Sequence, residues 1–253
     1  MSNRNPHCAK CAVVPEFGVF LQCCFRDRAH YPAEQRMGWF MLAAVTVLGV
    51  LTYLAYWAFL VDMAGVAARV GPQLGYLVLS IVILAGAAWH LKAFRRDLGE
   101  STAMMVGMTF GMMAGFLGGY LVGATNGMFT GSVFGVIAGC ALGWYVSDCC
   151  AMMSRMEGLM AGLMSGVMGA MTSVMLLNDR LAWFTPFLLV TSIVILSGHT
   201  YLVHREHRQR QGVEVVFRGP GILPFLVACF VVLLVSAGVM IAGPKSVLFL
   251  AFL

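Results

Sequence analysis

Charged residues are what this sequence has least of. Only 11% of its 253 residues are Asp, Glu, Lys or Arg, whereas 60% are hydrophobic. A soluble domain carries about 25% charged residues, so a chain of this composition is expected to lie mainly in lipid. The basic residues fall between the apolar runs. The net charge of +5 is therefore read as membrane topology, and no nucleic-acid partner is expected.

Several signatures of enzymes and pumps are also missing. The chain has no nucleotide-binding loop, no GxGxxG after a predicted strand, and no Ser, His and Asp in the order of a hydrolase triad. The first 36 residues are polar and charged, so no signal peptide is expected. No carboxylate or lysine falls in the middle of the third to fifth apolar runs, which disfavours a proton-coupled pump. We expect a membrane protein that is not an enzyme.

Seven apolar runs are each close to the ~20 residues that a helix needs to cross a bilayer. They lack the alternation of strands, and only helices or closed barrels satisfy their backbone groups in lipid. Ala124-Thr125-Asn126-Gly127 is a turn signal that predicts a hairpin. The predicted fold is an all-α, polytopic membrane helix bundle with about seven transmembrane helices. The runs are 38–61, 74–94, 102–124, 129–147, 156–177, 181–202 and 222–242.

Basic residues mark every second loop. They precede the first run and follow the second, fourth and sixth, whereas the alternate loops carry few. Because basic loops stay in the cytoplasm, this pattern predicts a bacterial inner-membrane protein with its amino terminus inside and its carboxyl terminus outside. The predicted organisation is a cytoplasmic, cysteine-bearing segment at 1–36, a seven-helix domain at 37–245 and an interfacial tail at 246–253.

Glycine recurs at strict intervals of four through the third and fourth runs. Glycine inside a helix costs roughly 1 kcal/mol relative to alanine, so a regular ladder needs a compensating gain. In lipid that gain is the close approach of neighbouring helices. We expect a glycine-zipper core of helices three to five, with a pore wall of exposed carbonyls as the alternative. The glycines expected to pack helices are Gly107, Gly111, Gly115, Gly119, Gly123, Gly127, Gly131, Gly135, Gly139 and Gly143, with Gly158, Gly162 and Gly166 in the fifth run.

Methionine is concentrated in the same region, where 14 of the 19 fall between Met104 and Met175. In the fifth run the methionines are offset by two residues from the glycines, which places them on the opposite helix face. A thioether is a neutral, soft ligand that suits Cu(I), although a methionine stripe can equally fill apolar gaps. The candidate metal ligands are Met104, Met108, Met112, Met156, Met160, Met164, Met168, Met171 and Met175.

Cysteines form a second set of candidate ligands. Cys8 and Cys11 form a CxxC motif that Cys23 and Cys24 follow. Cys149 and Cys150 end the fourth run. The loop charges place all six near the cytoplasm, where thiols stay reduced and are read as ligands instead of disulfides. Cu(I) and structural Zn(II) both stay open for the amino-terminal set, and small buried side chains are the alternative for the pair.

These motifs resemble two kinds of protein. Met104, Met108 and Met112, with Gly111 and the glycines after it, and Met156, Met160 and Met164 are similar to the MxxxM and GxxxG motifs of high-affinity eukaryotic copper transporters. In that family the methionines ring a threefold axis and the glycines tighten the bundle. The stretch 156–175 also resembles uncharacterised bacterial Met/Gly-rich membrane proteins thought to handle copper.

Two functions follow from these observations. The first is a membrane protein that binds or translocates a soft metal ion, Cu(I), along the methionine stripe toward cytoplasmic cysteines. The second is a non-catalytic subunit or assembly factor of a larger membrane complex, with a zinc knuckle at its amino terminus. The partners expected are the lipid bilayer and either other subunits or further copies of the chain.

Overall fold

The computed structural model describes residues 32–59, 64–93, 99–147, 152–177, 181–211 and 222–243, and all regular elements within them are α-helices. Six of the helices in these ranges contain a stretch long and apolar enough to cross a membrane. The prediction of an all-helical membrane bundle is confirmed at this level. The helices are α3 (Pro32–Phe59), α4 (Ala64–Ala93), α5 (Glu100–Asn126), α6 (Met128–Val146), α7 (Met152–Leu176), α8 (Leu181–Gln211) and α9 (Ile222–Ala242).

Helices α3 and α8 each extend beyond one end of the predicted span. Helix α3 begins at Pro32, six residues before its predicted run at 38–61. Helix α8 continues to Gln211, past the predicted end at residue 202, because its polar continuation consists of residues that tolerate a helix and contains no Gly or Pro. Residues 32–36 of the predicted amino-terminal segment belong to α3. Residues 1–31 and the predicted tail at 246–253 lie outside the described residues.

The predicted hairpin between the third and fourth runs is confirmed. Helix α5 ends at Asn126 and α6 begins at Met128, with Gly127 alone between them. Gly127 has a φ of 90°, and among the described residues no other has a positive φ. A side chain is disfavoured at this angle, so Gly127 serves the turn. It therefore differs from the other glycines of the ladder, which lie within helices.

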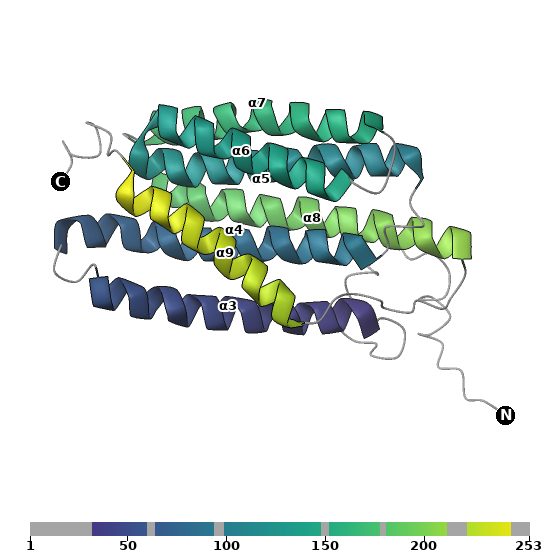
Figure 1. Cartoon of the computed structure of the whole chain (residues 1–253), viewed down its shortest axis with the longest axis horizontal. Helices are drawn as coiled ribbons and strands as arrows, with labels where there is room; N and C mark the ends of the chain where they lie inside the picture. The colour runs from purple at the N-terminus through teal and green to yellow at the C-terminus, as the bar shows by residue number, and fades with distance from the viewer. Residues whose placement is uncertain are drawn as a thin grey trace.

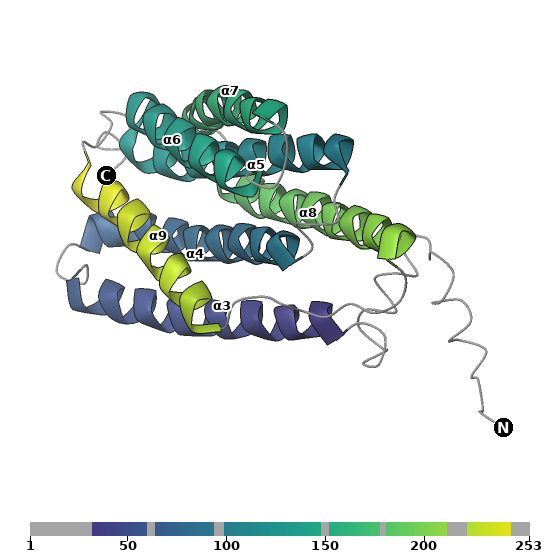
Figure 2. The same ribbon diagram turned by 45° about the vertical axis from the view of Figure 1, so that its right-hand side comes forward.

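The helices form two parts of different density. Helices α5, α6 and α7 lie closest to one another, and we call them the three-helix unit. Helices α3, α4, α8 and α9, the four-helix part, lie on the other side of α5, as Figures 1 and 2 show. Helix α9 crosses α4 and α3 obliquely (Figure 1). Helix α7 contacts only α5 and α6 to any extent within the described chain, so its remaining surface faces outward.

Large side chains fill the contacts of α5 with the four-helix part. Tyr120 is fully buried and lies 3.0 Å, oxygen to oxygen, from the hydroxyl of Thr185 on α8. Phe110 and Val106 form a second buried cluster with residues of α4 and α8. Helix α5 therefore packs against bulky residues of the four-helix part on one side and against glycines of α6 and α7 on another.

Candidate metal-binding surface

Helix α7 has two faces of opposite composition. Its buried residues are all small: Ser154, Gly158, Ala161, Gly162, Ser165, Gly166, Gly169, Ala170 and Ser173. The methionines lie on the other face, and Met160, Met164 and Met175 are 66%, 63% and 68% exposed. Met156, Met168 and Met171 are exposed as well. The predicted opposition of the two faces is confirmed, and the thioethers point away from the rest of the bundle.

The small face of α7 lies directly against the backbones of α5 and α6. A Cβ atom built on Gly139 of α6 would lie 2.8 Å from the Cα of Gly115 on α5 and 2.8 Å from the Cα of Gly162 on α7. A Cβ on Gly143 would lie 2.6 Å from the carbonyl oxygen of Gly158. At these positions the centre of the three-helix unit has no room for a methyl group. The carbonyl of Gly158 there lies against the backbone of a neighbouring helix, as the packing expectation describes.

The contacts between α5 and α7 set the register of these two parallel helices. The hydroxyl of Ser165 lies 3.4 Å from the carbonyl oxygen of Gly111, to which it donates. One turn further on, Gly169 lies against the backbone of Phe116. Gly111 lies against Gly158 and Gly162, so Met112, the next residue, lies beside about 159–163 of α7.

Exposed methionines of both helices flank this contact. Met164 lies about one turn and Met168 about two turns further along α7 than the level of Met112, at 3.6 residues per turn. Met112 is 38% exposed, and Met164 and Met168 of α7 are 63% and 59% exposed. Their thioethers therefore lie on the outer surface near the α5–α7 contact. We call Met112, Met164 and Met168 the thioether cluster.

The exposed side of α5 is a narrow stripe. Its members within the helix are Ser101, Met105, Met108 and Met112, whereas Met104 is half-buried. Figures 1 and 2 show the first half of α5 lying between α7 and α8. The spacing of four predicted Met104, Met108 and Met112 as ligands and left out Met105, which is 59% exposed. The spacing of three and four among Met105, Met108 and Met112 is the signal that places them on one face.

The cysteine ligands predicted from the sequence do not enter this geometry. Cys8, Cys11, Cys23, Cys24, Cys149 and Cys150 all lie outside the described residues. Cys140 and Cys229 are free thiols, and that of Cys140 donates to the carbonyl of Leu159 at 3.3 Å. Across the described ranges, no three His, Cys, Asp or Glu side chains gather at one place that could hold a metal ion. The methionines are the candidate ligands that the structure describes.

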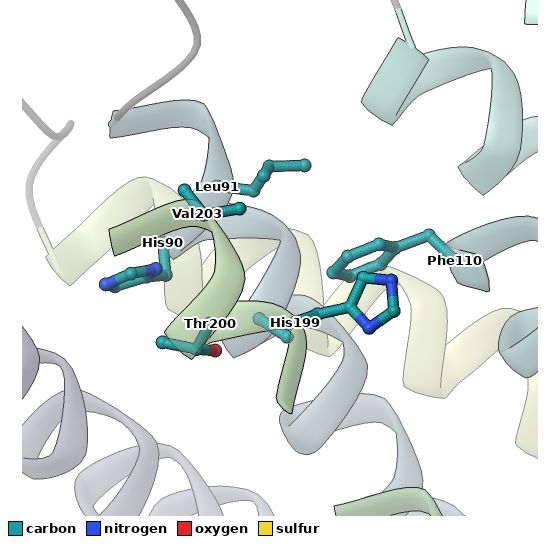
Figure 3. A pocket seen from close by; sticks show the side chains of 7 residues that line it. His90, Leu91, Phe110, His199, Thr200 and Val203 are labelled. Carbon is teal, nitrogen blue, oxygen red and sulfur yellow. The ribbon is translucent and has the colours of Figure 1, made fainter. Parts of the chain in front are cut away.

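Two histidines line a cavity of about 10 Å³ between α4, α5 and α8, which is space for about one water molecule. Figure 3 shows that the rings of His90 and His199 lie on different sides, with that of His199 beside Phe110. The Nδ1 atom of His199 lies 3.3 Å from the carbonyl oxygen of Ile195, one turn earlier in the same helix. The two rings therefore do not converge on a shared ion.

The chain was compared with known proteins. No family model matches it, and neither a curated protein nor a solved structure does.

Proposed function

We propose that this protein binds a soft monovalent metal ion, Cu(I), through methionines of α5 and α7 within the membrane. The observation that carries the proposal is the thioether cluster, in which two helices contribute exposed methionines on both sides of one helix–helix contact. Cu(I) is well served by soft thioether ligands, and these residues do not titrate. Leucine would face lipid equally well, so bulk alone does not account for sulfur at these positions.

The stripe along α7 offers further sites on both sides of the cluster. Met156, Met160 and Met164 are four residues apart, which is about 6 Å along the helix axis. A row of weak sites at this spacing suits movement, because conduction requires an ion to be released as readily as it is bound. In the orientation predicted from the loop charges, the row leads from the outside toward the end of α7 that Cys149 and Cys150 precede in the sequence. Thiolates hold soft metals more tightly than thioethers, so the proposed direction is inward.

The exposure of the cluster adds a requirement. A Cu(I) ion bound by neutral thioethers keeps its positive charge, and a charge that faces lipid is costly. The ion therefore needs another protein surface over the methionine face. A second copy of the chain or a partner subunit would supply it, in keeping with the partners expected from the sequence.

The first prediction tests the cluster directly. Replacing Met112, Met164 and Met168 together by leucine should lower the number of Cu(I) ions bound per chain, because leucine keeps the volume and removes the soft donor at these three positions. The measurement is the copper content of the purified full-length protein after anaerobic loading with Cu(I) and removal of the excess. Met128→Leu is the matched control, since Met128 is 46% exposed but lies on α6. Unchanged copper content in the triple variant, with the helical signal intact, contradicts the proposal.

One observation favours the second function, a non-catalytic subunit of a larger complex. Helix α6 is buried only through its glycines and Val146, and it exposes Phe129 and Ile137. Such a face is available to a partner helix as well as to lipid. Copper in the protein isolated from its native membrane would favour the first function. Zinc alone, together with co-purifying partners, would favour the second.

A further inference from the structure

A basic residue lies over an aromatic ring where α6 and α7 meet. The guanidinium carbon of Arg155, in the first turn of α7, lies 5.2 Å from the centroid of the Trp144 ring near the end of α6. This distance is that of a cation–π contact. Trp144 is 41% exposed and Tyr145, the next residue, is 46% exposed. We propose that Arg155 and Trp144 bind the phosphate group of an anionic membrane lipid.

The length of α6 determines the depth of this pair in the membrane. The chain reverses direction at Gly127 and again between Val146 and Met152, since α6 runs antiparallel to both α5 and α7. Backbone that reverses has to lie outside the lipid-exposed hydrocarbon, where water can satisfy its polar groups. The 19 residues of α6 measure about 28 Å at 1.5 Å per residue, which is close to the ~30 Å of the hydrocarbon core. Each reversal therefore lies at one boundary of the membrane.

The packing of α6 against α7 places Arg155 at the same boundary. The glycines that touch across this contact are Gly139 with Gly162 and Gly143 with Gly158. Continued by three residues, this register brings Arg155 level with Val146, the last residue of α6. Trp144 lies two residues deeper, about 3 Å at 1.5 Å per residue. Tryptophan and tyrosine are enriched at this depth because one end of each ring is apolar and the other is wet.

The chemistry of a guanidinium at this depth suits a phosphate. A cation–π contact uses the charge of Arg155 and none of its N–H donors. A guanidinium has five such donors, so it can hold a phosphate alongside other partners, and its planar fork matches two phosphate oxygens. Glu157 is two residues further on and about 200° round the helix, so the two charges point to different sides of α7.

The net charge of the headgroup decides which lipid is preferred. Lipid phosphates lie at the membrane boundary, and basic pockets between transmembrane helices recognise anionic headgroups. A zwitterionic headgroup carries its own ammonium group, which competes with Arg155 for the phosphate. Phosphatidylglycerol has no such group, so its phosphate is open to the guanidinium.

The test uses the full-length protein, purified in detergent and offered equal amounts of phosphatidylglycerol and phosphatidylcholine. Native mass spectrometry counts the lipids that each chain retains. We expect phosphatidylglycerol to be retained several-fold more often. Arg155→Gln removes the charge and Trp144→Leu removes the ring that holds it, so each should lower this preference several-fold. Arg155→Lys should keep only part of the preference, because an ammonium is a point charge without the planar fork.

The matched control is Arg205→Gln, which changes the net charge by the same amount at an exposed arginine of α8. An equal loss in this control would show attraction by net charge alone and overturn the proposal, as would equal retention of the two lipids by the wild type. Displacement of phosphatidylglycerol by millimolar inorganic phosphate, but not by chloride at the same ionic strength, would assign the site to free phosphate instead of lipid. Helical circular dichroism checks folding. Should Arg155→Gln fail to fold, the preference of the wild type and of Arg155→Lys decides the question.

Discussion

The three-helix unit and the four-helix part are held together by opposite kinds of residue. Between α5, α6 and α7 the contacts are glycine against glycine, as at Gly139, Gly115 and Gly162. Between α5 and the four-helix part they are large side chains, such as Phe110 and Tyr120. In lipid there is little hydrophobic drive to bring helices together, so close van der Waals contact and hydrogen bonds decide association. Glycine gains that contact through the backbone, and bulky residues gain it through interdigitation.

This difference determines what each part can present to its surroundings. A helix that packs through its smallest residues has every large side chain left for its outer face, as α7 has with its methionines. A helix that packs through large residues buries those side chains within the bundle. The glycine contacts are therefore what frees the thioethers for an external role, and the two observations belong together.

The largest effect is expected from closing the tightest contact. Gly139→Ala places a methyl group 2.8 Å from two backbones on two different helices, and neither can move without parting from the other. We expect a loss of about 1–3 kcal/mol, the usual range for overpacking. The measurement is the unfolding of the detergent-solubilised protein followed by its helical circular dichroism.

The control for that variant is expected to change the stability in the opposite direction. Gly238→Ala enters open space on α9, where alanine instead of glycine stabilises a helix by roughly 0.5–1 kcal/mol. Equal effects at the two positions would show that the three-helix unit does not depend on close backbone approach.

A smaller loss is expected on the other side of α5. The Thr185 hydroxyl donates to the carbonyl of Leu181 at 2.9 Å, so its contact with Tyr120 is one in which the phenol donates. Tyr120→Phe removes that bond and keeps the ring among its aromatic neighbours. We expect a loss of about 0.5–1.5 kcal/mol, the usual net worth of such a bond. The same unfolding measurement checks it, and a loss larger than that of Gly139→Ala would invert the comparison between the two parts.

The sequence predicted the helices well because apolar runs of membrane length leave the backbone little choice. It also placed the methionines of α7 opposite the glycines, since the helical period fixes relative angles on one helix. Periodicity within one helix does not say which neighbour a face meets. It therefore missed that Gly139 touches both α5 and α7, although the turn signal that includes Gly127 predicted the hairpin.

The hollow between α3 and α4 and the thioether cluster depend on how neighbouring helices are placed, which no single apolar run of the sequence contains. Gly49 and Gly75 look like other helical glycines in the sequence, and only the placement of α3 against α4 leaves them facing a hollow. Met112 comes to lie beside α7, about one turn before Met164, because the α5–α7 contact fixes the register of the two helices. Register between helices is set by tertiary contacts, which a local pattern does not carry.

The smallest effect separates two explanations of the α5–α7 contact. Ser154 donates to the carbonyl of Ala103 at 3.0 Å and Ser165 to that of Gly111 at 3.4 Å, so hydrogen bonds accompany the glycines. Interhelical bonds of this kind average about 0.6 kcal/mol in membranes. Ser154→Ala should therefore cost about that amount and Ser165→Ala less, because its bond is longer and its hydroxyl is also shared with Gly162 at 3.2 Å. Serine variants that cost more than Gly139→Ala in the same unfolding measurement would make the hydrogen bonds, and not the close backbones, the main source of cohesion in the three-helix unit.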